Sequence, residues 1–167
     1  MIKSDLRRIK LRMIESNYEF LDCGYNAAIF YDSESSLVRK VFFQKGRTHS
    51  EVRAIYNAEI EAYKIAMNST TLKPFVPGQF KRCENQKIVD GNGLFCSSLF
   101  FEDCAYEIEF VRGDFVKVGA LGTPEARALI RAFKNEGINH TSDMSVVLDD
   151  DEKILKAIDF ATQEFEF

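Results

Sequence analysis

Residues 18–43 of the chain, YEFLDCGYNAAIFYDSESSLVRKVFF, contain three short apolar runs separated by two groups of turn-forming residues. The runs cover 18–21, 27–31 and 37–43, and Asp, Gly, Asn and Ser fill most of the gaps between them. Runs of this length, rich in aromatic and aliphatic residues and bounded by turn formers, are typical of antiparallel strands. The stretch therefore predicts two successive β-hairpins at the start of the fold.

The chain beyond these hairpins predicts two helices and several further strands. Residues 49–67 place apolar side chains at three-and-four spacing, which predicts a long helix. A second helix is delimited by Thr123 as N-cap, Pro124 at the first helical position and Gly137 at its end. Further strands are predicted at 80–83, 87–89, 94–101, 106–111, 146–148 and 154–158. This order of elements predicts an α+β fold with an antiparallel sheet.

The first 16 residues predict a basic amphipathic helix. Residues 1–14 hold five basic side chains against one acidic side chain, and Leu6, Ile9 and Met13 recur at helical spacing. One interpretation is a helix that docks on an acidic lipid surface or partner. The other, which we favour, is a helix that packs its apolar stripe on its own domain and leaves its charges in water.

Length and composition limit the class of protein. The 167 residues suffice for about one domain, and 46% apolar with 29% charged residues is typical of a soluble globular chain. The formal net charge of −4 gives no support for a nucleic-acid-binding function. The apolar runs fall short of the ~20 residues that a membrane-spanning helix needs, so we expect no membrane span.

The cysteines and the N-terminal residues bear on the compartment. The four cysteines form no C-x-x-C pair and are typical of reduced thiols in a cytosolic-type protein. Only His49 and His140 accompany them, so the spacing along the chain predicts no zinc site. Basic residues interrupt the apolar core that a signal peptide would need. We expect a cytoplasmic protein, or one delivered into a host or target cell without such a signal.

Four separated features carry residue types suited to phosphate chemistry. The turn at 22–30 contains small residues around Gly24, which allow backbone N–H groups to approach phosphate oxygens. Lys40 stands in an apolar strand and shares a face with Val38 and Phe42, where an ammonium group requires an anionic partner. By itself the first feature is usually just an ordinary hairpin, and the second is equally well an edge-strand lysine with its head group in water.

The other two features are acidic. Glu59 lies on or beside the apolar stripe of the long helix, where its carboxylate would satisfy Lys40. Asp159 closes an apolar strand between Ile158 and Phe160, a position from which it could hold a metal cation, and residues 137–143 precede that hairpin with His140 among them.

In this order the four features resemble the protein-kinase-like fold over residues 17–161. The resemblance implies a kinase-like N-lobe at 17–111, made of an antiparallel sheet and an αC-type helix. It also implies a truncated C-lobe at 112–167 with one helix and a short hairpin, the two lobes forming a single compact domain. The segment 107–113 is similar to the hinge that meets adenine through backbone groups.

The resemblance also implies cofactors and residue roles. ATP and Mg²⁺ would be the cofactors, with Lys40 and Glu59 positioning phosphates and Asp159 binding the metal. His140 is similar to the catalytic-loop histidine, and Asp143 would orient or deprotonate the acceptor hydroxyl. The nucleotide would contact Gly24, Tyr25, Asn26, Ala27, Ile29, Lys40, Glu109 and Val111.

Several positions depart from the family's pattern. Ser142 stands where the catalytic aspartate is expected, the family's second metal ligand, an asparagine, has no counterpart, and Ala161 replaces the glycine after Asp159 and Phe160. The expected C-lobe also lacks the helical part that docks a peptide. Three interpretations follow: a compact effector-type kinase that acts on or is activated by a partner protein, a pseudokinase that binds or inhibits a protein, and an unrelated α+β interaction module.

Overall fold

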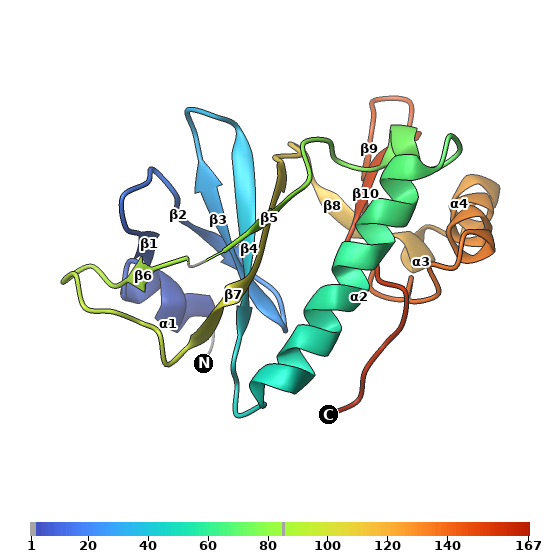
Figure 1. Ribbon diagram of the computed structural model, residues 1–167. Helices are drawn as coiled ribbons and strands as arrows, with labels where there is room; N and C mark the ends of the chain where they lie inside the picture. The colour runs from blue at the N-terminus through green and yellow to red at the C-terminus, as the bar shows by residue number, and fades with distance from the viewer. Residues whose placement is uncertain (1–2, 85) are drawn as a thin grey trace. The chain divides into compact units, whose positions relative to one another are not determined.

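A computed structural model describes residues 3–84 and 86–167 (Figure 1). The chain forms two compact units. The first contains the residues up to Tyr56 together with Gln79–Phe110 and Phe167, and the second contains Asn57–Gly78 and Val111–Glu166. The expected lobe boundary follows residue 111, whereas the division falls after Phe110 and the second unit also takes Asn57–Gly78.

The first unit is built on a seven-stranded antiparallel sheet. Its strands lie in the order β5-β7-β4-β3-β2-β1-β6 (Figure 1). They are β1 (Arg12–Met13), β2 (Glu19–Cys23), β3 (Ala27–Asp32), β4 (Leu37–Phe43), β5 (Lys81–Cys83), β6 (Ile88–Val89) and β7 (Phe100–Glu109). Together with the helices described below, this sheet confirms the predicted α+β class.

The two hairpins predicted from residues 18–43 are confirmed by the pairing of β2 with β3 and of β3 with β4. The second turn shows why its sequence forms a hairpin. The Asp32 carboxylate accepts hydrogen bonds from the Glu34 backbone N–H at 2.9 Å and the Ser35 hydroxyl at 2.6 Å. Ser36 then adopts a positive φ of 56°. The short polar side chains of this turn therefore replace the backbone bonds that the turn interrupts.

A cluster of buried residues fills one side of this sheet. Its largest members are Phe30 and Phe100, whose ring centroids lie 6.2 Å apart, and Phe43 stacks on Phe100 at 5.1 Å. The cluster comprises Leu6, Leu11, Met13, Tyr18, Ala28, Phe30, Val41, Phe43, Cys83, Ile88, Cys96, Phe100 and Ala105. Each large aliphatic or aromatic side chain buried in this way contributes roughly 1.5–3 kcal/mol of transfer free energy, so this cluster stabilises the unit.

The structure of the N-terminal segment differs from the basic helix predicted over residues 1–16. Residues 1 and 2 lie outside the described part of the chain, within which helix α1 spans Lys3–Arg8. Lys10 has a positive φ of 52°, which ends the helical path. Residues 12–13 pair instead with β6 and β2, since Met13 N donates to Tyr18 O at 3.0 Å and Ile14 N to Lys87 O at 2.9 Å. Leu6 is buried in the core cluster, so the helix packs on its own unit.

Helix α2 (His49–Asn68) matches the long helix predicted at 49–67. A capping box begins it: the Glu51 carboxylate accepts from the Thr48 backbone N–H at 2.7 Å, and Glu51 N donates to the Thr48 hydroxyl at 3.3 Å. Within the first unit Tyr56 packs edge-on against Phe42 at 5.6 Å and donates from its hydroxyl to Ala105 O at 3.1 Å. The helix thus holds its N-terminal half against β4 and β7.

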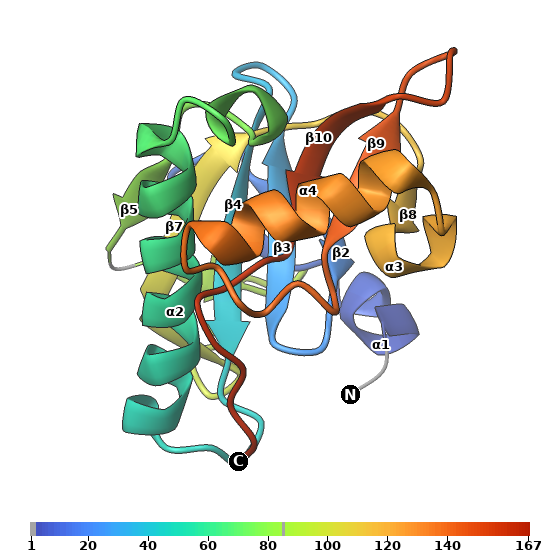
Figure 2. The same cartoon turned by 90° about the vertical axis from the view of Figure 1, so that its right-hand side faces the viewer.

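The second unit combines a small sheet with helices (Figure 2). Its strands lie in the order β10-β9-β8, and its aromatic core joins Phe160 to Tyr63 and Phe133 at ring distances of 4.6 and 4.8 Å. The elements are η1 (Lys73–Phe75), β8 (Phe115–Lys117), α3 (Val118–Leu121), α4 (Pro124–Asn135), β9 (Ser145–Leu148) and β10 (Ile154–Ile158). Thr123 caps α4 as predicted, because its hydroxyl accepts from Ala126 N at 3.2 Å.

The strands predicted separately at 94–101 and 106–111 form a single strand, β7 (Phe100–Glu109). The residues before it form turns, since the Asp90 carboxylate accepts from Asn92 N and Leu94 N, and Leu99 N donates to Cys96 O at 3.0 Å. Strand β8 and helix α3 were not predicted. No helix among the described residues is long and apolar enough to cross a membrane.

Candidate functional site

The residues predicted to act on a nucleotide are divided between the two units. The first unit holds Gly24, Tyr25, Asn26, Ala27, Ile29, Lys40 and Glu109. The second unit holds Glu59, Val111, His140, Asp143 and Asp159.

Lys40 lies on β4, the middle strand of the run β5-β7-β4-β3-β2. It pairs with Ile29 on one side and Tyr106 on the other. Its Nζ atom lies 5.5 Å from the ring centroid of Phe42 and 5.9 Å from that of Tyr106. The ammonium therefore shares the face of Phe42, as the alternation along the strand predicts, and that face is the one on which Tyr56 of α2 packs.

In a phosphate-binding loop, the backbone N–H groups point toward the ligand, and the β2–β3 turn differs from such a loop. Gly24 N donates to Ala27 O at 2.9 Å, so this N–H closes the turn and is not available to a phosphate in this conformation. Phe43 N donates to Asn26 O at 2.9 Å and fixes the other side of the turn. A Cβ atom built on Gly24 meets nothing within 4 Å, so no neighbouring protein atom requires glycine there.

Two basic residues that the sequence analysis did not single out hold this turn. Lys45 Nζ donates to Tyr25 O and lies 4.6 Å from the centroid of the exposed Tyr25 ring. Arg47 Nη1 donates to the Asn26 side-chain oxygen at 2.7 Å. Burial and the nearby Arg47 lower the pKa of Lys45. The sequence signal is the basic cluster Lys45-Gly46-Arg47 directly after β4, which brings two cations to the turn.

The two expected adenine contacts lie at and beyond the end of β7. Glu109 is the last residue of β7, pairs with Leu37 and is exposed. Phe110 N donates to Ser36 O at 3.0 Å, and its ring packs on Tyr31 with centroids 4.5 Å apart. Val111 follows as a half-buried residue of the second unit.

In the second unit, backbone hydrogen bonds join the segments that carry His140, Asp159 and Glu59. His140 N donates to Ala161 O at 3.0 Å, and Ala161 N donates to His140 O at 3.1 Å. Thr162 N donates to the carbonyl of Ala58, the residue before Glu59, at 3.2 Å. Glu59 is buried, with 8% of its surface exposed. Asp159, two residues before Ala161, is half-buried and has a positive φ of 60°.

The His140 imidazole is flanked by two carboxylates. Nε2 lies 3.7 Å from Asp143 Oδ2, and Nδ1 lies 3.6 Å from Glu164 Oε2. The Ser142 hydroxyl lies 3.4 Å from Nδ1. The imidazole is largely buried at 17% exposure, whereas the Asp143 side chain is 72% exposed. His140 therefore lies beside an exposed carboxylate, that of Asp143. Glu164 is a further neighbour, which the sequence analysis missed because it lies 24 residues further along the chain.

These groups border an open depression of about 500 Å³ within the second unit. His140, Thr141 and Ser142 form one side, and Lys134 and Glu164 contribute opposite charges to the rim. Nearby, Lys117 Nζ donates to the backbone carbonyl of Asp143 at 2.6 Å, which fixes the loop that carries this carboxylate. The depression is large enough for a small polar group to reach Ser142 and His140.

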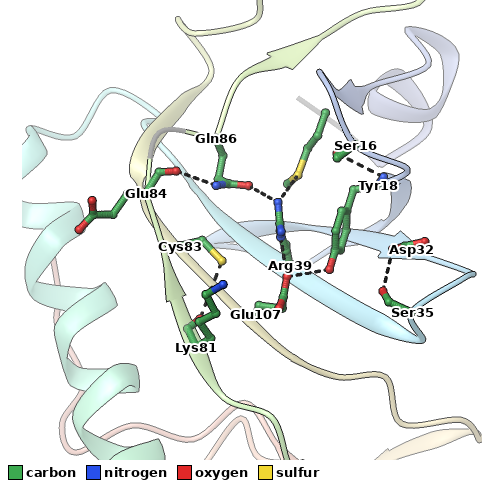
Figure 3. Close-up of polar contacts among 11 residues, drawn as sticks. Ser16, Tyr18, Asp32, Ser35, Arg39, Lys81, Cys83, Glu84, Gln86 and Glu107 are labelled. Carbon is green, nitrogen blue, oxygen red and sulfur yellow. Dashed lines mark hydrogen bonds and ion pairs between the residues drawn. The ribbon is translucent and has the colours of Figure 1, made fainter.

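A separate polar network lies on the core side of the first unit's sheet (Figure 3). Glu107 Oε2 accepts from Arg39 Nε at 2.7 Å and from the Tyr18 hydroxyl at 2.7 Å. Arg39 Nη1 donates to Gln86 Oε1 at 2.8 Å, and the guanidinium lies 4.1 Å from the centroid of the Tyr18 ring. Glu107, which the resemblance places in the hinge segment, thus takes part in this internal ion pair.

The network changes the acidity of its members. Burial opposes ionisation of Glu107, but the hydrogen bonds from Tyr18 and Arg39 prevail and lower the pKa of its carboxyl group. Burial and the adjacent Glu107 carboxylate raise the pKa of Tyr18 to about 12. Both shifts favour the charge arrangement seen, an ionised carboxylate between a guanidinium and a neutral phenol.

Comparisons with protein families, with curated proteins and with solved structures find no match for this chain. Its function is therefore inferred from its own residues and their arrangement.

Proposed function

We propose that the chain is an ATP-dependent phosphotransferase of minimal protein-kinase type that uses Mg²⁺ and acts on, or is activated by, a partner protein. The observation that carries this proposal is the reciprocal backbone pair between His140 and Ala161. His140 is similar to the catalytic-loop histidine. Its partner Ala161 follows two positions after Asp159, the residue similar to the metal-binding aspartate. A kinase needs these two segments side by side.

Lys40 supports the same proposal from the first unit. It is a half-buried residue on β4, an interior strand of the antiparallel sheet, and its Nζ lies 5.5 Å from the Phe42 ring centroid. In a kinase a lysine at this place steadies the α- and β-phosphates, and a helix carboxylate, here assigned to Glu59, orients it. The basic residues Lys45 and Arg47, which hold the β2–β3 turn, add positive charge near the expected phosphates.

The residues present suit Mg²⁺. Asp159 offers a half-buried carboxylate, and Mg²⁺ is commonly held by one or two carboxylates together with substrate phosphate oxygens. When bound, the ion would neutralise charge on the transferred phosphoryl group. Glu59, assigned to positioning Lys40 and the phosphates, lies on the segment that Thr162 N joins to the Asp159 loop through the carbonyl of Ala58.

The proposed reaction forms one phosphorus–oxygen bond, breaks another and moves one proton. The acceptor hydroxyl oxygen forms a bond to the γ-phosphorus while the bond from that phosphorus to the bridging oxygen of ADP breaks. Asp143, whose carboxylate is exposed beside His140, would accept the hydroxyl proton. Most of the remaining acceleration in such a transfer comes from positioning and charge neutralisation, so one missing metal ligand would slow it without abolishing it.

A pseudokinase that binds nucleotide and a protein without transfer is the second candidate. The observation that favours it is the replacement at the catalytic loop, where Ser142 contacts the imidazole and the neighbouring Asp143 lies 3.7 Å from the same ring. The position of the family's catalytic aspartate is thus occupied by a serine.

Two measurements separate these candidates. Thermal shift with Mg·ATP measures nucleotide binding, and transfer of radiolabelled phosphate, with and without eukaryotic lysate, measures catalysis. Stabilisation with transfer supports the kinase, and stabilisation without transfer supports the pseudokinase. The absence of any stabilisation would contradict both.

Two variants test the assigned roles. Lys40→Met should lower the affinity for Mg·ATP by at least about tenfold, and the thermal stabilisation by Mg·ATP should fall with it. The substitution removes a charge that binds phosphate and retains an apolar side chain. The exposed Lys87→Met is its matched control.

Asp143→Ala should leave nucleotide affinity within about twofold and lower transfer by 10²-fold or more, whereas the exposed Asp150→Ala should change neither. Persistent transfer in Asp143→Ala would show that another group accepts the proton.

A further inference from the structure

Three residues with metal-ligating side chains meet in the first unit where α2 begins against β7. They are His49, Asp103 and Cys104, and their candidate ligand atoms all lie within 4.8 Å of one another. His49 Nε2 lies 2.8 Å from Asp103 Oδ2, and Cys104 Sγ lies 3.9 Å from Asp103 Oδ1. The carboxylate thus has one oxygen toward the imidazole and the other toward the thiol.

The local backbone explains how adjacent residues reach one site. The pairing of β4 with β7 is irregular between Val41–Ala105 and Phe43–Phe100, so the strand bulges at residues 101–104. Such a bulge redirects side chains that would otherwise point to opposite faces of the sheet. His49, the first residue of α2, packs its ring edge-on against Phe101 at 5.0 Å, which orients the imidazole toward the bulge.

We propose that His49, Asp103 and Cys104 bind a Zn²⁺ ion through imidazole nitrogen, carboxylate oxygen and thiolate sulfur, with the fourth position open to water or a partner's side chain. Histidine and cysteine together are the side chains that Zn²⁺ prefers, and three protein ligands with one open position are a common arrangement. This proposal is independent of the nucleotide site and would stand if that site were absent.

The spacing of the atoms is close to that of a tetrahedral ion. With Zn–N and Zn–O near 2.05 Å and Zn–S near 2.3 Å, tetrahedral ligand atoms lie ~3.3 Å apart for N and O and ~3.6 Å apart when sulfur is one of them. The two printed contacts reach different oxygens of Asp103: His49 Nε2 lies 2.8 Å from Oδ2, and Cys104 Sγ lies 3.9 Å from Oδ1. Because the three candidate ligand atoms lie within 4.8 Å of one another, the widest separation must close by up to ~1.2 Å for all three to bind one ion.

Exposure also suits a bound ion. The side chains of His49 and Asp103 are 46% and 40% exposed, and Asp103 lines a depression of about 220 Å³, so an ion can reach the site from solvent. Cys104 is fully buried on the opposite side. Arg53 Nη1 holds Asp103 Oδ2 at 3.2 Å, which orients the carboxylate and leaves Oδ1 on the side of the thiol.

Binding would require one ionisation. Burial and the Asp103 carboxylate raise the pKa of Cys104 to about 11, against the opposing effects of Arg53 and Arg82. The thiol is therefore protonated near neutral pH, and a bound ion would displace that proton to solvent as the sulfur–metal bond forms.

The test is a titration of the reduced, tag-free chain with Co²⁺, followed by displacement with Zn²⁺. A tetrahedral site with one thiolate should give a sulfur-to-cobalt charge-transfer band that saturates at one ion per chain and disappears when Zn²⁺ is added. His49→Gln should weaken binding by at least about tenfold, and Cys104→Ser should remove the band. Cys96→Ser, a second buried thiol of the same unit, and His140→Gln should leave both unchanged.

Far-UV circular dichroism and urea unfolding show whether each variant is folded. His49→Gln keeps the test decisive if Cys104→Ser does not fold, because the His49 side chain is exposed. The proposal is overturned if excess Co²⁺ gives no band, if His49→Gln binds as the unchanged chain does, or if Cys96→Ser removes the band. The contacts of His49 and Arg53 with Asp103 would then serve only to join α2 to β7.

Discussion

At the scale of single residues, Glu107 is a charge of the first unit held by two partners. It pairs with Arg39 directly across β4 and β7 and also accepts from the Tyr18 hydroxyl. The side chains of Glu107 and Arg39 are 10% and 23% exposed, so water screens this pair less than it screens a surface ion pair. Removing one partner leaves the other charge partly buried and uncompensated. Breaking the pair therefore lowers the free energy of unfolding by more than forming the pair contributes to it.

Glu107→Gln should lower the free energy of unfolding by about 2 kcal/mol, because the neutral amide accepts more weakly from Arg39 and Tyr18. Urea unfolding at pH 7 measures the effect. Glu19→Gln, at an exposed position of the same sheet, should change stability by less than about 0.5 kcal/mol. Equal effects of the two substitutions would show that the Glu107 network contributes nothing specific.

Tyr18 predicts a loss of stability at alkaline pH. Its pKa is raised from 10.0 to about 12 in the folded chain, so folding favours the protonated phenol. This contribution is fully present below pH 10 and is lost as the pH rises toward 12. Between pH 9 and pH 11, the fall in unfolding free energy should be about 1 kcal/mol smaller in Tyr18→Phe than in the unchanged chain. Parallel pH profiles would contradict the shift.

At the scale of elements, helix α2 depends on how it begins. The reciprocal hydrogen bonds of Thr48 and Glu51 satisfy backbone N–H groups that have no partner within the helix. The first turn also carries His49 and Arg53, both in contact with Asp103 of β7. The start of α2 therefore sets the geometry both of the helix and of the proposed zinc ligands.

Thr48→Ala should lower the free energy of unfolding by about 1 kcal/mol, since it removes the capping hydroxyl. Thr48→Ser retains that hydroxyl and should recover most of the loss. Ser50→Ala, at an exposed position one residue inside the helix, is the matched control and should be neutral or slightly stabilising. Urea unfolding followed by far-UV circular dichroism compares the three, and an equal loss in Thr48→Ser would argue against the cap.

At the scale of the whole molecule, α2 is the element that both units share. The division falls between Tyr56 and Asn57, in the middle of a continuous helix of 20 residues. Tyr56 on one side bonds to β7 through Ala105 O, and Ala58 on the other accepts from Thr162 N. Covalent and hydrogen-bonded continuity through this helix predicts that the two units lose structure together.

Asn57→Pro tests that expectation. Proline in a helix interior removes a backbone hydrogen bond and clashes with the preceding turn, at a cost of about 3 kcal/mol or more. We expect hydrogen exchange to accelerate in β7 and in the 159–162 segment alike, whereas Asn57→Ala at this exposed position should leave both protected. Faster exchange in one unit alone would show that the units are stabilised independently.

Local chemistry accounts for what the sequence determined. The turn formers between residues 18 and 43, the apolar periodicity of 49–67 and the Thr123–Pro124 start of α4 act over a few residues, so the hairpins and the bounds of both helices could be predicted. The face of Lys40 followed from strand alternation in the same way. The end of α1 could not, because β1 forms only where β2 and β6 supply its hydrogen bonds.

Tertiary structure alone decided which distant residues meet. Arg39 and Glu107 are 68 positions apart, and His49 and Asp103 are 54 apart, yet both pairs are in contact. Strand order, register and the bulge in β7 fix these contacts, and none of the three is encoded by the spacing of the residues concerned. The sequence therefore specifies elements through short-range interactions, whereas the internal ion pair and the metal-ligating cluster exist only because packing of the apolar core brings those elements together.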